Sequence, residues 1–432
     1  MNATPATLPG PAAALAFFCI LLVPMAAGGL ALINAGLGRS RNASHMMLSS
    51  LCVFGLGAVA FFVLGFAWQG YAGRPAYAFL ISGRSWSWIA SEPFFFRGFS
   101  LDGSNVSLAA LLGMMSAGLA CAIPLGSGSD RWRLGAACAW AAVSAGLVYP
   151  VFAHWIWGGG WLAQLGENYG LGRGVIDSGG GLPIQAVGGV AALAVTWILK
   201  PRRGKYTPDR MPLAIPGHNS VIVLLGCFLV WLGFIGLDCA GAILYTGVEA
   251  GRSVLITANA TLAAASAMLS AACITRIRYG KPDASVCANG WVSGLVASSA
   301  GCAVIPPAAA MIVGIVAGML VTFGVEWLEL YLTIDDPGGT ISVHLLGGLW
   351  GAAATAWFAN EVSGANGSGQ TLAQLTGVAT VLGFVLPVTY GLNALLDRFY
   401  PIRVTVAGER QGLDLHELGA GAYPDFISHK DD

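Results

Sequence analysis

Two stretches of the sequence share a pattern of residues whose chemistry would matter inside a membrane helix. Asp177 and Asp336 each precede a pair of glycines, and eight residues after each aspartate comes a polar residue, Gln185 or His344. The copies are 159 residues apart and share the pattern D-x-G-G-x4-[Q/H]-x2-G-G. A carboxylate at a helix entrance accepts unpaired N–H groups and suits the positive end of the helix dipole. We therefore expect Asp177 and Asp336 to act as structural helix caps.

Gln185 and His344 are the candidates for chemistry within the membrane. Eight residues correspond to roughly 12 Å of helix, which places both side chains well inside a bilayer. A polar side chain at that depth is costly and by default indicates a transport pathway. The alternative is that His344 only forms a hydrogen bond between two packed helices. Its correspondence with Gln185 favours the pathway.

The composition excludes a water-soluble protein. Only 10% of the 432 residues are charged and 56% are apolar, with a mean hydropathy of +0.70. So few charges cannot cover the surface of a soluble domain, and disordered chains are poor in apolar residues. The 61 glycines suit closely packed transmembrane helices, and zero net charge argues against a nucleic-acid partner. The sequence predicts a multi-pass protein of the cell membrane, in contact with the lipid bilayer.

Hydropathy predicts eleven transmembrane helices. A bilayer core needs roughly 20 apolar residues per helix. The expected spans are 12–36, 46–69, 105–125, 134–155, 183–200, 219–245, 253–275, 286–302, 307–330, 341–360 and 372–398.

The distribution of positive charge predicts the orientation. Of the 21 Lys and Arg residues, 16 fall on one side of these spans and 5 on the other. Because cytoplasmic loops carry the excess, the N-terminus is expected outside and the C-terminus inside. The first 25 residues contain no Lys or Arg, so we expect the first span to be retained, although a cleaved signal peptide is the alternative.

The position of the repeated pattern predicts the domain organisation. Five spans separate the copies, so they cross the membrane in opposite directions, which is typical of an inverted repeat. We expect an all-α membrane domain over 1–398, with five-helix halves at 12–200 and 219–360 and an eleventh span at 372–398. A cytoplasmic tail follows at 399–432.

No residue cluster predicts catalysis or a cofactor. The nine cysteines fall mostly in apolar runs without a CxxC pair, as expected of small packing residues. No nucleophile–base pair or metal-ligand cluster is evident, so we expect no metal, no cofactor and no enzyme activity.

Several segments make the chain recognisable over nearly its whole length. The sequence resembles the ammonium transporter, methylammonium permease and Rhesus family. The resemblance implies a homotrimer with one narrow pore per subunit and, as a possible partner, a cytoplasmic regulator of the PII type. It rests on AHWIWGGGWLAQLG at 153–166, GRGVIDSGGG at 172–181, RYGKPDAS at 278–285, DDPGGTISVH at 335–344 and GLDLHELGAGAY at 412–423.

Some family positions are matched here. Family members recruit the cation in an outer vestibule and pass it between two phenylalanines to a lumen lined by two facing histidines. The vestibule tryptophan matches Trp157, and Tyr149 matches eight residues earlier. Trp157 is expected to attract the cation through its ring face. Asp177 matches the aspartate before span five, and His344 matches the second pore histidine.

Other family positions differ. The first pore histidine falls on Gln185, and the gating phenylalanines fall on Ser116 and Leu237. The family's WFGFNxGS reads FIGLDCAG here, which puts Asp238 at the usual asparagine and Gly241 at the recruiting serine.

These differences predict altered chemistry. Glutamine cannot accept a proton near neutral pH, so a proton relay between two histidines cannot operate unmodified. The smaller side chains of Ser116 and Leu237 predict a wider, wetter gate. Asp238 is expected either to pair with a cation or to accept hydrogen bonds from neighbouring backbone.

Three functions fit these residues. The one we expect is a membrane channel for ammonium, ammonia or methylammonium with altered selectivity. A second is an amine-binding or organic-amine-conducting protein with Asp238 as counter-ion. A third is a non-conducting ammonium or amine sensor that acts through its cytoplasmic tail.

Overall fold

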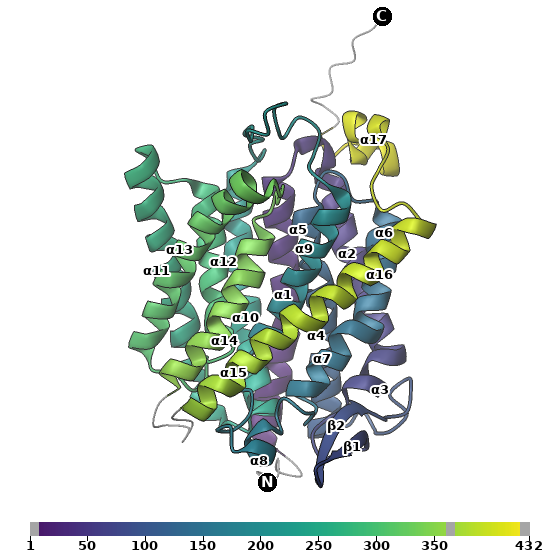
Figure 1. Ribbon diagram of the computed structural model, residues 1–432, viewed down its shortest axis with the longest axis vertical. Coiled ribbons are helices and arrows are strands. Elements are labelled where there is room, and N and C mark those ends of the chain that lie inside the picture. Colours follow the sequence, from purple (N-terminus) through teal and green to yellow (C-terminus); the bar gives the residue numbers. More distant parts are fainter. Residues whose placement is uncertain (1–7, 360–367, 424–432) are drawn as a thin grey trace, which may run out of the picture.

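The computed structural model describes residues 8–359 and 368–423, and these are almost entirely helical (Figure 1). The first half contains α1 (Gly10–Leu37), α2 (Ala43–Ala60), α3 (Phe66–Gln69), α4 (Asn105–Ala122), α5 (Leu125–Gly128), α6 (Leu134–Val143), α7 (Tyr149–Ile156), α8 (Leu165–Tyr169) and α9 (Val187–Leu199). The second half contains α10 (Ser220–Tyr245), α11 (Ser253–Tyr279), α12 (Ala284–Ser299), α13 (Pro307–Leu332), α14 (Gly347–Phe358), α15 (Ser368–Thr380), α16 (Leu386–Phe399) and α17 (Val406–Gln411).

Widened π-helical turns continue or open several of these helices. They join short α-helices into longer membrane spans, as where α15 and α16 form one strongly tilted rod across the molecule (Figure 1). These turns are η2 (Phe61–Gly65), η3 (Ser144–Val148), η4 (Gly181–Ala186), η6 (Ile341–Leu346), η7 (Val381–Val385) and η8 (Asp414–Leu418). Two short 3₁₀ turns, η1 (Ser40–Asn42) and η5 (Ala250–Arg252), precede α2 and α11.

Ten helical stretches of the described chain are long and apolar enough to span a membrane. The predicted span at 286–302 corresponds to α12, which has 16 residues and falls short of that length. In Figure 1, α1 begins at the end of the molecule that carries β1 and β2, and α16 finishes at the opposite end. An odd number of crossings joins opposite ends, which would require α12 to cross as a short span, and the count of eleven stays a prediction. The inside–outside orientation stays a prediction.

Glycines allow α1 and α10 to pack backbone against backbone. A Cβ on Gly29 would lie 2.5 Å from the carbonyl oxygen of Gly226, and a Cβ on Gly226 would lie 2.6 Å from that of Gly29. Any larger residue at either position would force the helices apart. This is the close approach that small residues provide in membrane helix pairs.

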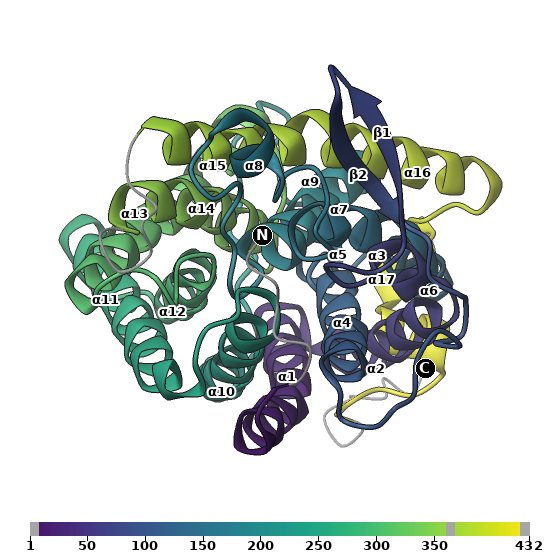
Figure 2. The same ribbon diagram turned by 90° about the horizontal axis from the view of Figure 1, so that it is seen from below.

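A β-hairpin stands at one end of the molecule, which we call the hairpin end. Strands β1 (Ala76–Ile81) and β2 (Arg84–Ala90) pair antiparallel with Ala76 opposite Ala90 (Figure 2). The indole N–H of Trp155 donates to the carbonyl of Trp88 at 2.7 Å, which ties the hairpin to α7. This small sheet was not predicted. It is an insertion in an otherwise helical membrane protein.

Charged residues at the opposite end, the tail end, form a buried network. Arg202 is 4% exposed and donates to both oxygens of Asp335 at 2.9 Å, and to Asp130 at 2.9 Å. Arg131 is fully buried and donates to four backbone carbonyls, including that of Asp335 at 2.8 Å. Burial alone would raise the pKa of Asp335, but Arg131 and Arg202 lower it to about 2. In the sequence, these arginines indicated only the orientation in the membrane. In the structure they connect loops that are far apart along the chain.

The described part of the tail caps helices of the membrane domain. Asp414 accepts the N–H groups of Ser44 and His45, at the first turn of α2, at 3.2 and 2.7 Å. Glu417 accepts from the N–H of Leu134 at 2.9 Å and contacts the His45 ring at 2.7 Å. Burial would raise the pKa of Glu417, yet these hydrogen bonds lower it below its usual value. The tail segment over η8 is thus part of the packed structure.

Candidate transport pathway

The two aspartates of the repeated pattern lie at the entrances of η4 and η6. Asp177 accepts three backbone N–H groups, from Gly180 at 2.6 Å, Gly181 at 2.9 Å and Leu182 at 2.6 Å. Asp336 accepts from the N–H of Ile341 and from the Ser127 hydroxyl, each at 2.7 Å. Burial raises the pKa of each carboxyl to about 6, against the effect of these donors. Both groups are positioned to satisfy the first turn of a broken helix.

The helix entrances also match in backbone conformation. Gly180 and Gly339, which are 159 residues apart like the aspartates, have φ of +92° and +65°. A side chain is strained in this left-handed region, and a Cβ at Gly180 would also lie 2.6 Å from Ile184. After each glycine the chain forms a π-helical turn, a feature often found at functional sites. The repeated pattern therefore encodes the same local structure twice.

Gln185 and His344 meet where the two broken helices approach each other. The Oε1 atom of Gln185 lies 2.7 Å from Nδ1 of His344, and the two residues are 0% and 3% exposed. Because Oε1 can only accept, Nδ1 carries the ring proton and Nε2 of His344 is left as an acceptor. The amide nitrogen of Gln185 is buried without a hydrogen-bond partner in the described chain. The pair thus offers one unused donor and one acceptor in the middle of the protein.

The space on the tail side of this pair is narrow. His344 lines a cavity of about 10 Å³ together with Asn34, Asn289 and Thr340. That volume is about the minimum that a single water molecule needs. The cavity as it stands has room for about one molecule of the size of water or ammonia.

The gate positions are closed in this structure. Ser116 on α4 and Leu237 on α10 are both fully buried. Their small side chains have therefore not produced the wider, wetter opening expected from the sequence, because the surrounding helices close over them. The Ser116 and Tyr149 hydroxyls are both buried and lie close enough to interact with each other, although the contact falls outside ordinary hydrogen-bond geometry.

The vestibule tryptophan has an aromatic partner that the sequence did not reveal. The Trp157 ring stacks on Tyr245 with centroids 4.5 Å apart and planes at 6°. Its indole N–H donates to the carbonyl of Asp177 at 2.8 Å, which holds the ring beside the entrance of η4. Tyr149, by contrast, lies deeper, with its ring 6.0 Å from Phe61. An aromatic residue at the end of the predicted span 219–245 was the only available signal for Tyr245.

Asp238 is a fully buried acidic residue whose two oxygens make no hydrogen bond of ordinary geometry in the described chain, although the Ser299 side chain lies close enough to interact with it. It lies against the backbone of Gly179, so close that a Cβ at that glycine would have no room. Gly241, one turn further along α10, approaches the carbonyl oxygen of Ser178 in the same way. A Cβ on the neighbouring Gly180 would lie 3.0 Å from the ring of Trp157. Asp238 and Trp157 therefore contact the same glycine-rich entrance of η4.

The described residues offer no metal centre. Within 8–359 and 368–423 no three His, Cys, Asp or Glu side chains lie close enough together to hold a metal ion. All nine cysteines are free thiols.

A helical bundle with two matching broken helices and a buried polar pair between them defines a multi-pass membrane transport protein. The chain belongs to the Ammonium Transporter Family, whose sequence model matches residues 13–423.

Individual relatives agree with this assignment. An ammonium transporter Amt2 of Archaeoglobus fulgidus is 34% identical over 95% of this chain and 88% of its own length. The ammonium transporter of Bacillus subtilis is 30% identical over 95% of this chain and 98% of its own. Among solved structures, a sensor Amt protein superposes with a TM-score of 0.85 at 26% identity, covering 94% of this chain and 98% of that one. Mep2 of Candida albicans has a TM-score of 0.80 at 24% identity, over 97% and 92% of the two chains, and supports the fold.

Proposed function

We propose that this protein is a membrane ammonium channel in which neutral ammonia crosses the narrowest part of the pathway. Relatives at 34% and 30% identity over nearly the whole chain are named ammonium transporters. The observation that carries the proposal is the hydrogen bond between Gln185 and His344 at 2.7 Å, where the two broken helices meet.

The hydrogen-bonding groups of this pair suit ammonia better than ammonium. Ammonia has one lone pair and three N–H groups, so it can accept from the Gln185 amide and donate to Nε2 of His344. Ammonium has no lone pair, so its N–H groups would face the N–H groups of the Gln185 amide and could not accept a hydrogen bond from them. Ammonium therefore releases its proton to the outer solution, ammonia passes, and a proton from the inner solution restores the ion.

Cation recruitment occurs before that step, at the hairpin end. The stacked rings of Trp157 and Tyr245 supply aromatic faces, and Asp238 supplies a buried acidic side chain beside the same entrance, which a bound cation would hold ionised. Family members have a recruiting serine at the position of Gly241, and glycine lacks its hydroxyl. The carboxyl group of Asp238 would take the place of that neutral acceptor. In this proposal Tyr149 belongs with Trp157, Asp238 and Gly241 to the substrate-binding residues, and Ser116 and Leu237 form the gate between recruitment and the Gln185–His344 pair.

A flux experiment tests the proposal. Purified protein in liposomes that contain a pH-sensitive dye receives a pulse of ammonium chloride outside. We expect the lumen to become alkaline faster than in empty liposomes, without a transmembrane current, because ammonia enters alone. Methylammonium serves as a second substrate. Flux equal to that of empty liposomes, with amine binding detected by calorimetry, would instead support the sensor or the organic-amine protein.

Replacement of the recruiting ring gives a second prediction. Trp157→Leu should raise the half-saturating ammonium concentration about twofold to thirtyfold, since a cation–π contact contributes roughly 0.5 to 2 kcal/mol. Stopped-flow fluorescence over a series of ammonium concentrations measures it. Trp161→Leu is the matched control, because Trp161 belongs to a separate aromatic cluster with Trp88 and Trp155. An unchanged concentration dependence in Trp157→Leu would remove this residue from recruitment.

We further propose that three copies assemble and that a PII-type regulator binds at the tail end. Support comes from family membership and from a tail that docks on the membrane domain through Asp414 and Glu417. Native mass spectrometry in lipid nanodiscs measures the copy number. We also propose the domain boundary at 398, which agrees with the end of α16 at Phe399.

The sensor function is the less favoured alternative. One solved relative is called a sensor Amt protein, which is a statement about that protein.

A further inference from the structure

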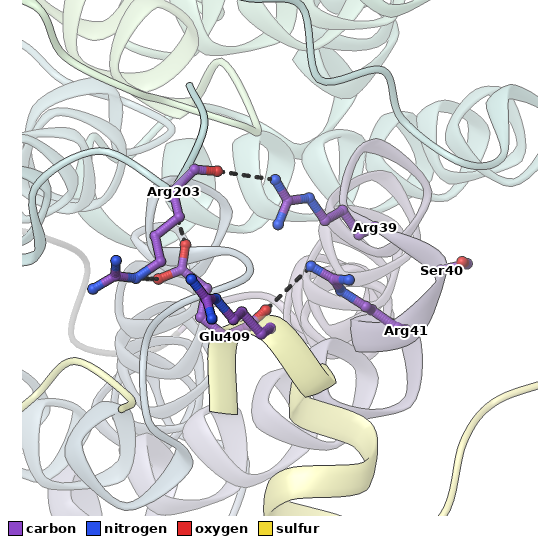
Figure 3. A pocket seen from close by; sticks show the side chains of 6 residues that line it. Arg39, Ser40, Arg41, Arg203 and Glu409 are labelled. Carbon is purple, nitrogen blue, oxygen red and sulfur yellow. Dashed lines mark hydrogen bonds and ion pairs between the residues drawn. The ribbon is translucent and has the colours of Figure 1, made fainter. Parts of the chain in front are cut away.

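A basic cavity lies at the tail end, away from the transport pathway. It has a volume of about 540 Å³ and is open to solution. Three separate parts of the chain form it: the turn between α1 and α2, the loop after α9, and the tail helix α17 (Figure 3). The lining residues are Arg39, Ser40, Arg41, Arg203, Glu409 and Arg410.

The arginines of this cavity outnumber the carboxylates available to them. Glu409 is 2% exposed and already binds Arg403 at 2.7 Å, while the guanidinium of Arg203 is 3.8 Å away. Asp130 binds Arg202 at 2.9 Å and is 3.9 Å from Arg39.

Two of the arginines have no counter-ion of their own. Arg41 donates only to the carbonyl oxygen of Glu409 at 3.1 Å, and within 8–359 and 368–423 neither Arg41 nor Arg410 forms an ion pair. In Figure 3 the side chains of Arg39 and Arg41 extend from the same turn toward Arg203 and Glu409. The cavity therefore has uncompensated positive charge.

Membrane orientation alone does not require this arrangement. Cytoplasmic loops are rich in Lys and Arg in general, and exposed positive charges satisfy that rule wherever they stand. Arg276 on α11 is such an exposed cation without a neighbouring carboxylate, far in sequence from the cavity. Four arginines from three chain segments repel one another when they lie close together, which raises the electrostatic free energy. A bound anion would offset that repulsion.

We infer that this cavity binds a phosphate-bearing anion, either a soluble phosphate compound or the headgroup of an anionic lipid. Arginine is the side chain best suited to it, because its planar fork donates two parallel hydrogen bonds to phosphate oxygens. The volume lies within the range of small-molecule sites, which is about 300 to 1,000 Å³. A carboxylate alone would use fewer of the converging donors.

Such an anion would hold the tail against the membrane domain. Arg39 and Arg41 precede α2, whereas Arg410 belongs to α17, so a ligand bound by all three bridges the two elements. The same tail segment caps α2 through Asp414. Occupancy of the cavity therefore stabilises the docked tail, independently of what the pore conducts.

Binding and hydrogen exchange test the site in the full-length protein. Calorimetry in phosphatidylcholine nanodiscs uses pyrophosphate as the soluble probe, and deuterium exchange follows the amides of residues 406–411. Arg41→Gln and Arg410→Gln are each expected to weaken pyrophosphate binding about tenfold or more, as for loss of one charge-assisted hydrogen bond. Neither arginine forms an ion pair in the described chain, so both variants should fold. Arg276→Gln is the matched control and should bind normally.

The outcomes separate the two sources of phosphate. Pyrophosphate binding that slows exchange in α17 and is weakened in both variants supports a soluble phosphate ligand. No pyrophosphate binding, with slower exchange in phosphatidylglycerol nanodiscs for wild type but not for Arg41→Gln, supports a lipid headgroup. Failure of both probes, or equal losses in Arg276→Gln, would overturn the site.

Discussion

Gln185→His should convert an electroneutral ammonia flux into one accompanied by an electrical current. The substitution places two imidazoles in contact where wild type has an imidazole and an amide 2.7 Å apart. Two titratable rings can pass a proton between them, whereas an amide cannot accept one. A positioned proton-transfer group contributes about a hundredfold or more to a rate. We therefore expect a current at least about tenfold above the background of empty liposomes, where wild type shows none above that background.

Solid-supported membrane recordings of proteoliposomes measure this current after an ammonium pulse. Gln185→Leu is the control, since it matches glutamine in size but carries no titratable group. It should show no current and a lower ammonia flux, because the buried Nδ1–H of His344 loses its acceptor at a cost of about 1 to 3 kcal/mol. A current already present in wild type, or its absence in a well-folded and flux-competent Gln185→His, would contradict passage of neutral ammonia in the native pair.

Asp238→Asn should raise the half-saturating ammonium concentration at least about tenfold while leaving the fold intact. Asp238 is fully buried with no cationic side chain paired to it in the described chain, and a buried carboxylate of that kind is costly until a bound cation offsets the cost. Asparagine preserves the shape and removes the charge, so binding weakens by about 1.4 kcal/mol or more, which corresponds to tenfold. The unliganded protein should melt at the same temperature or higher, because the unpaired charge is gone.

Two measurements on the same variant separate recruitment from a structural role. Flux at graded ammonium concentrations reports the affinity, and the melting temperature with and without ammonium reports binding independently of transport. Asp209→Asn, in an exposed loop of the tail end, controls for the loss of one negative charge. If Asp238→Asn gains stability but keeps the wild-type concentration dependence, Asp238 is a buried structural acid and takes no part in recruitment.

Local patterns in the sequence identified the centre of the candidate site because the relevant chemistry is repeated locally. The helix entrances at Asp177 and Asp336 and the polar residues eight positions later are visible as one motif used twice. Depth within a span follows from the rise per residue, so Gln185 and His344 could be placed in the membrane before any contact was known. Their direct hydrogen bond could not, since it joins residues 159 positions apart.

Other features lacked a local signal. The stacking of Trp157 on Tyr245 joins α10 to the end of α7, and either aromatic ring alone looks like an interfacial anchor. The closed gate at Ser116 and Leu237 depends on how neighbouring helices pack around small side chains. The hairpin β1–β2 lies between the expected spans 46–69 and 105–125, in a stretch for which no secondary structure was predicted.

The amino-acid sequence by itself determined the class of protein, the positions of the spans and the residues that are polar within them. It could do so because hydropathy and motif spacing are properties of contiguous segments. Tertiary structure decided which of these residues meet. Burial and hydrogen bonding depend on separate segments coming together, so only the folded chain shows Asp238 buried against Gly179, Glu409 among arginines and His344 bound to Gln185.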